Sequence, residues 1–234
     1  MYYLQHLLIV ILILLFGAPV RSELLIIGMR DDVYDPDMLK ASKYVQQAAL
    51  ASGNTIEFSY LPAKRSLRLA SSGSLDGEFY RHTIIEPLYP SLMRVDVVLG
   101  NFDYYIWVYA ENNCMEDWEA LTVLKPAGAR GVIFFESRVY PISKVGYEQV
   151  TRIGTIMELL KRGRADYTVH NPSVIQQYSQ QTGIKLKRCF DTPLFSMNFY
   201  LYLHESKRHL ISDLEQALRD TNIESNKPSI LKPD

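Results

Sequence analysis

Hydrophobic and polar residues follow one another with two different spacings along the first third of the chain. Residues 24–27 form an unbroken apolar run that predicts a buried strand, and residues 55–60 alternate apolar and polar side chains as a half-buried strand does. Between them, the apolar positions of residues 36–52 repeat with the period of one helix face. A short helix over residues 63–72 precedes a further strand that begins near Asp76. Strand, helix, strand and helix in this order predict a parallel sheet with right-handed crossovers.

The next stretch of the chain predicts a passage from one folded unit to another. Residues 82–92 contain two prolines and predict a short helix or a loop, whereas residues 94–99 predict a strand. Residues 103–110 are strongly aromatic, which also indicates a strand. We expect this last strand to be long enough to cross between two lobes.

A second α/β unit is predicted from residue 111 onward. Its patterns first predict a short helix at 115–121, a strand at 130–135 and a loop or irregular helix at 136–146. Strands at 147–150, 165–169 and 185–189 then alternate with helices at 153–162 and 171–182. A strand at 198–203 and a helix at 207–220 come last. The order of helix, Gly163, Asp166 and strand repeats the order of helix, Gly73, Asp76 and strand in the first half. The two halves therefore show a coarse echo of each other.

The N-terminal residues have the pattern of an export signal. Residues 7–16 form an unbroken apolar run followed by Gly17, Ala18 and Pro19. Such a run is too short to span a bilayer comfortably but has the length of a signal-peptide core. We expect residues 1–22 to be a cleaved secretory signal. An uncleaved membrane anchor over residues 2–20 is the alternative.

Charge and composition limit the function classes. The 234 residues contain 25 Lys and Arg against 26 Asp and Glu, with no basic tract, so we expect no nucleic-acid partner. Aromatic residues make up 12% of the chain, which indicates a folded and not a disordered protein. The length after the signal allows one large domain or two lobes.

The two cysteines, Cys114 and Cys189, lie far apart in the sequence and lack a metal-type neighbourhood. In an exported protein, an even pair predicts one disulfide. Two free buried thiols are the alternative.

Candidate chemistry of other kinds is absent from the sequence pattern. The histidines lack the spacing of metal ligands, and no Ser/His/Asp, Cys/His or paired-carboxylate arrangement stands out. We therefore expect no metal, no cofactor and no enzyme activity.

Several short motifs together resemble those of a known family. They are Pro62, Arg65, Gly73, Asp76 and Gly77 in the first half, Gly163, Arg164 and Asp166 in the second half, and the late run 200–204 with its helix. In these residues the chain resembles the extracellular solute-binding proteins of family 3, the polar-amino-acid type of ABC-transporter periplasmic binding protein. The resemblance covers nearly all of residues 23–221.

The resemblance implies an α/β fold of the type II periplasmic-binding-protein kind, with two lobes, two hinge crossings and a small ligand held between the lobes. Lobe one would comprise residues 23–106 and 193–234, and lobe two residues 107–192. The hinges would lie around residues 105–107 and 199–201. The resemblance further implies a monomer in the periplasm whose partner is an ABC permease or a membrane sensor.

Two positions depart from the family pattern. In such binders a first-lobe arginine clamps the ligand carboxylate, and the matching position here is Leu88. Arg81 lies nearby and can do a similar job with its planar fork. In the second lobe, Asn171 stands where the family has the carboxylate that receives the ligand amine. A neutral amide offers no charge-balanced partner to an ammonium group, so we do not expect an ordinary α-amino acid as ligand.

The candidate ligand-binding residues stand at strand ends and loops that border the expected cleft. They are Asp31, Tyr34, Arg65, Glu78, Tyr80, Arg81, Glu136, Ser137, His170 and Asn171.

Structural roles compete with ligand binding at most of these positions. Arg81 could instead pair with Glu78 or Glu86, and Asn171 could cap the helix that follows it. Arg65 could be solvated, Tyr80 could simply pack, and residues 31–34 could form a plain polar turn.

Three functions stay open on the sequence alone. The leading hypothesis is capture of a small polar, anionic solute for transport or sensing. A second is an exported enzyme on the same scaffold, resembling a cyclohexadienyl dehydratase, with Glu78 and His170 as acid and base. A third is a degenerate binding-protein fold that only mediates protein contacts.

Overall fold

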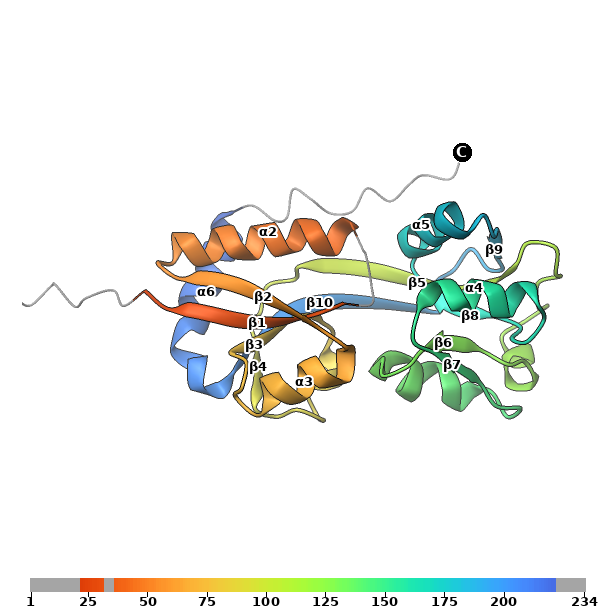
Figure 1. The fold of residues 1–234 in the computed structure, drawn as a ribbon, viewed down its shortest axis with the longest axis horizontal. Helices are drawn as coiled ribbons and strands as arrows, with labels where there is room; N and C mark the ends of the chain where they lie inside the picture. Colours follow the sequence, from red (N-terminus) through yellow and green to blue (C-terminus); the bar gives the residue numbers. More distant parts are fainter. Residues whose placement is uncertain (1–21, 32–35, 222–234) are drawn as a thin grey trace, which may run out of the picture.

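The structure, a computed structural model, describes residues 22–31 and 36–221. The signal predicted for residues 1–22 therefore lies, except for Ser22, outside the described residues, and so does Tyr34. In the described ranges, no helix is both long and apolar enough to cross a membrane. Two α/β lobes lie side by side and are joined by long strands (Figure 1).

Lobe one is built on three parallel strands. β1 (Leu24–Arg30) pairs in parallel with β2 (Thr55–Leu61) on one side and with β3 (Gly77–Arg81) on the other. The helices α2 (Pro36–Ala51) and α3 (Ala63–Ser71) make the crossovers between these strands. The parallel sheet predicted from the alternation of strands and helices is confirmed.

Two long strands, β5 (Gly100–Tyr109) and β10 (Phe195–His204), run from one lobe to the other (Figure 1). They pair antiparallel from Gly100 opposite Phe199 to Tyr104 opposite Phe195. Beyond this segment they separate. β10 pairs with β3 and with β4 (Leu92–Arg94) in lobe one, while the second half of β5 pairs with two strands of lobe two. The predicted pair of crossing strands is therefore present. The segment in which they pair, residues 100–104 with 195–199, directly precedes the predicted hinge at 105–107 and meets the one at 199–201 in Phe199.

Lobe two contains shorter elements. They are the 3-10 helix Glu119–Val123, the parallel strands β6 (Ala127–Ala129) and β7 (Glu148–Val150), the helices α4 (Ile153–Lys161) and α5 (Pro172–Thr182), and the strands β8 (Thr168–His170) and β9 (Leu186–Arg188), which both pair with β5. The chain then returns along β10 to lobe one, where the 3-10 helix Glu205–Leu210 and α6 (Ile211–Asp220) follow.

The buried apolar side chains form separate clusters on the two sides of the paired segment. The buried members of two clusters lie within residues 25–102 and 199–218, and those of the other two lie within residues 106–174. Each lobe therefore has its own core, and the space between the lobes is available for a site.

The two similar stretches in the halves of the sequence form the same kind of turn. Gly73 and Gly163 both take a positive φ, of 74° and 63°, which glycine adopts without strain. After each glycine an aspartate carboxylate accepts a backbone N–H from a segment distant in sequence: Asp76 Oδ2 from Ile26 at 2.7 Å, and Asp166 Oδ2 from Lys125 at 2.7 Å. Asp166 is thus structural, as predicted.

The strand predicted over residues 94–99 is wrong beyond its first residue. The chain turns after β4, because the Val97 N–H donates to the Val95 carbonyl at 2.8 Å. The Asp96 N–H donates to the Glu215 carboxylate at 2.7 Å instead of to a neighbouring strand.

The strand predicted over residues 130–135 is also wrong. Gly131 takes a φ of 78° and turns the chain out of β6, and the segment Phe135–Val139 is a π-helix. Its apolar run packs inward as one helical turn, with Phe134 and Phe135 buried. A short apolar run does not distinguish a buried strand from a buried helical segment, so the pattern alone could not decide.

The predicted disulfide is present. Cys114 and Cys189 are bonded, with a Cα–Cα distance of 5.2 Å. The bond lies within lobe two and ties the loop after β5 to the segment after β9. Trp118 stacks on Phe190 beside it, with ring centroids 4.3 Å apart.

Candidate functional site

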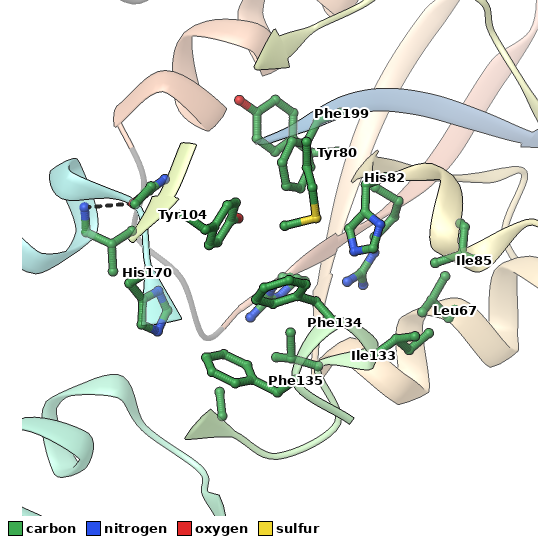
Figure 2. A pocket seen from close by; sticks show the side chains of 17 residues that line it. Leu67, Tyr80, His82, Ile85, Tyr104, Ile133, Phe134, Phe135, His170 and Phe199 are labelled. Atoms are coloured by element: carbon green, nitrogen blue, oxygen red, sulfur yellow. Dashed lines mark hydrogen bonds between the residues drawn. The ribbon is translucent and has the colours of Figure 1, made fainter. Parts of the chain in front are cut away.

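A cavity of about 70 Å³ lies between the lobes (Figure 2). Its lining comes from lobe one, from both crossing strands and from lobe two. Lobe one contributes Arg30, Leu67, Tyr80, Arg81, His82 and Ile85; the crossing strands contribute Tyr104, Met197 and Phe199; and lobe two contributes Ala129, Val132, Ile133, Phe134, Phe135, His170, Asn171 and Val174. A solute in this cavity would touch both lobes and the strands that connect them.

A bulge in β3 brings three consecutive residues to the cavity. Successive side chains of a regular strand point to opposite faces, yet Tyr80, Arg81 and His82 all line this cavity. Tyr80 has a φ of 62°, the only positive value among the described non-glycine residues, and the register between β3 and β10 shifts at this point. Bulges and left-handed residues of this kind re-aim side chains and concentrate at functional sites. The Tyr80 ring stacks on Phe199 at 4.9 Å.

A buried ion pair holds Arg81 at the cavity wall. Its Nε and Nη2 donate to Glu78 Oε1 at 2.8 and 2.5 Å, and Nη2 also donates to the Ala63 carbonyl at 3.3 Å. The other carboxylate oxygen of Glu78 accepts from Ser66 Oγ at 2.5 Å. The ion pair considered from the sequence is therefore present. Glu78 is fully buried and does not itself line the cavity.

His82 is a neutral hydrogen-bond donor at this wall. Its Nδ1 accepts from the Ile84 N–H at 3.2 Å, so in the neutral ring Nε2 carries the proton. Burial, and then the positive charges of Arg81, Arg30 and Arg138, lower the pKa of His82 to about 4. The ring is thus uncharged at neutral pH.

The polar residues of lobe two come from the end of β8. Asn171 Oδ1 accepts from the Val174 N–H at 3.1 Å and caps α5, so the capping role considered from the sequence is confirmed. The His170 backbone carbonyl accepts a hydrogen bond from Trp107 Nε1 at 2.9 Å, and the His170 ring lies 5.6 Å from the Phe135 ring. The side chains of His170 and Asn171 are both buried and line the cavity.

The structure thus brings four of the predicted residues together and supports them with a fifth. Those around the cavity are Tyr80, Arg81, His170 and Asn171, and Glu78 lies behind Arg81.

Other predicted residues lie away from the cavity. Asp31 and Arg65 are exposed, and Ser137 Oγ donates to the Ile133 carbonyl at 2.7 Å. Glu136 pairs with Lys64 at 2.9 Å. This last contact joins the first turn of α3 in lobe one to the π-helical segment of lobe two, at a partly exposed position.

Several lining residues were not predicted from the sequence. Arg30 ends the first strand and His82 follows Arg81 directly, so both stood beside predicted positions. Tyr104 and Phe199 lie in the aromatic crossing strands, where composition alone indicates only strand structure. Phe134 gave no signal, because its run predicted a strand and not a turn of helix facing the cleft.

The geometry of the described part of the chain indicates no metal centre. Within residues 22–31 and 36–221, no group of three or more His, Cys, Asp or Glu side chains is placed to hold a metal ion.

Two α/β lobes joined by two crossing strands, with a cavity between the lobes, define the type II periplasmic-binding-protein fold. A histidine kinase sensor domain with similarity to periplasmic binding proteins superimposes with a TM-score of 0.73 at 15% identity, over 92% of this chain and 100% of that chain. A protein described as an L-cystine ABC transporter from Listeria monocytogenes has a TM-score of 0.67 at 17% identity, over 85% of this chain and 90% of that chain. An ancestral arginine-binding protein bound to arginine has a TM-score of 0.66 at 16% identity, over 88% and 95%.

No protein-family description and no curated protein matches the sequence. At identities this low, the structural likeness establishes the fold alone.

Proposed function

We propose that this protein is a periplasmic solute-binding protein that captures a small polar, anionic solute between its two lobes. The observation that carries the proposal is the shared lining of the cavity, to which both lobes and both crossing strands contribute. A ligand that touches both lobes binds the closed arrangement better than the open one and shifts the population toward it. Binding is thereby converted into a change of shape that a partner can detect.

The proposal of an anionic solute rests on the two arginines that line the cavity, Arg30 and Arg81. Glu78 fixes the Arg81 guanidinium in one orientation and balances part of its charge. Asn171, where the related binders have an acid, uses its side-chain oxygen to cap α5. The site thus differs from one built for the ammonium group of an α-amino acid.

The proposal includes the lobe boundaries and the cellular setting. Lobe one would be residues 23–106 with 193–234, and lobe two residues 107–192. We propose that the protein acts as a monomer outside the cytoplasm. It would deliver its solute to an ABC permease or report it to a membrane sensor, and proteins of both kinds share its fold.

The enzyme hypothesis receives less support from the geometry. It needs Glu78 as an acid or base at the cavity, but this carboxylate is enclosed by Arg81 and Ser66. We therefore do not carry it further.

A thermal-shift screen of the mature protein against amino acids, dicarboxylates and other small anions tests the proposal. A ligand at a hundred times its dissociation constant adds about 2.7 kcal/mol to stability. For a chain of this size, that corresponds to a rise of about 5–10 °C in the melting temperature. No shift across a broad library would count against solute binding.

A further inference from the structure

A short segment of lobe two, residues 131–136, lies against lobe one beside the cavity. Its base is fixed in lobe two, because the Arg130 N–H donates to the Val150 carbonyl at 2.7 Å and Phe135 is buried in a core cluster of that lobe. The segment leaves β6 at Gly131, whose φ of 78° turns the chain. We call residues 131–136 the cross-lobe segment.

Ile133 makes the apolar contact of this segment with lobe one. It packs against a core cluster whose buried members, among them Leu67 and Ile85, all belong to lobe one. Figure 2 shows the Ile133 side chain next to that of Leu67. Ile133 is half-buried, so separating the lobes would return apolar surface to water. This contact therefore favours the closed arrangement.

Lys64, in the first turn of α3, makes two contacts with the cross-lobe segment. Its Nζ donates to Glu136 Oε1 at 2.9 Å. Its aliphatic stem lies over Gly131, since a Cβ at Gly131 would lie 3.3 Å from Lys64 Cγ. The absence of a side chain at Gly131 thus lets the lysine stem approach the backbone of the other lobe closely.

The contacts of Ile133 and Lys64 join the two lobes through side chains of the protein itself. An exposed ion pair stabilises little, whereas burial of an isoleucine side chain stabilises more, so we expect Ile133 to supply the larger part. Contacts that are present when the lobes are together and lost when they separate shift the population toward closure.

We propose that the cross-lobe segment is a latch that holds the two lobes closed independently of any solute. Ile133 supplies its apolar contact, and the pair of Lys64 with Glu136 fixes it on α3. The latch raises the population of the closed arrangement before a solute binds. A solute then needs a smaller difference in affinity between the two arrangements to complete the closure.

Small-angle X-ray scattering of the mature protein without added solute tests the apolar contact. The wild type should scatter as the closed arrangement does, and Ile133→Ala should lower the closed-to-open ratio by about tenfold, because most of the side chain is removed. Ile142→Ala is the control, since Ile142 is also partly buried but packs within lobe two. If circular dichroism shows Ile133→Ala to be unfolded, Ile133→Val replaces it, with a smaller expected drop. An open wild type, or equal ratios in the folded Ile133 variant and the control, would overturn the proposal.

Charge reversal tests the ion pair by the same measurement. Lys64→Glu and Glu136→Lys each place like charges across the cleft and should lower the closed-to-open ratio by about two- to fivefold. The double reversal restores opposite charges and should return the ratio to near that of the wild type. Lys40→Glu reverses an exposed lysine that pairs with Asp37 of its own helix, and should leave the ratio unchanged. A double reversal no more closed than the single variants would refute the role of the ion pair.

The outcomes separate the latch from the proposed function. If Ile133→Ala opens the lobes but no compound of the thermal-shift screen binds, the latch is supported and solute binding is not. If a solute binds but the latch variants scatter as the wild type does, the latch is refuted and solute binding stands.

Discussion

Acidification should destabilise the protein through His82. Its pKa is about 4 in the folded chain, against 6.5 for a histidine exposed to water as in the unfolded chain. Between these values the unfolded chain binds more protons than the folded one, so stability falls as the pH falls. The stabilisation is fully present above pH 6.5 and lost by pH 4.

The size of the effect follows from the two pKa values. A difference of one unit corresponds to 1.36 kcal/mol, so the total loss below pH 4 is about 3 kcal/mol. Between pH 7 and pH 5, proton linkage gives a loss of about 2 kcal/mol. The cause is local, namely burial of the ring and the positive charges of Arg81, Arg30 and Arg138.

Urea unfolding at pH 7, 6 and 5 measures this loss, with His82→Asn as the control. Asparagine stays neutral, and its Oδ1 can accept the Ile84 N–H that Nδ1 accepts now. Carboxylates such as Glu23, whose pKa is lowered by Lys207 and His209, contribute equally in both proteins. The wild type should lose about 2 kcal/mol more than the variant. Equal losses would refute the reasoning.

Three further predictions concern other parts of the molecule. Arg81→Met combined with Glu78→Gln should abolish binding of an anionic ligand and leaves no unpaired buried charge. If titration of the folded double variant gives the wild-type affinity, Arg81 is not part of the site. Asn171→Ala should lower the free energy of unfolding by about 1 kcal/mol through loss of the α5 cap, and an unchanged urea midpoint would contradict the capping role. Replacing both Cys114 and Cys189 by serine should lower stability by about 2–4 kcal/mol relative to the disulfide-bonded protein. Urea unfolding of the variant and of the oxidised wild type checks this value, and equal free energies of unfolding would contradict it.

The sequence by itself determined those features that depend on local pattern. Alternating strands and helices predicted the parallel sheet of lobe one, which the pairing of β1 with β2 and β3 confirms. Gly73 and Gly163 end their helices with a positive φ, and Asn171 caps α5. These features need only neighbouring residues and backbone preferences, so they can be predicted without knowing the fold.

Only the tertiary structure decided the contents of the cleft. Tyr80, Arg81 and His82 face one cavity because β3 has a bulge against β10, and the sequence carries no sign of that bulge. Phe134 lies in the cleft because Gly131 turns its segment out of the sheet. The cavity wall is made where segments distant in sequence meet, and side-chain packing between them, not local periodicity, selects which residues face the cavity.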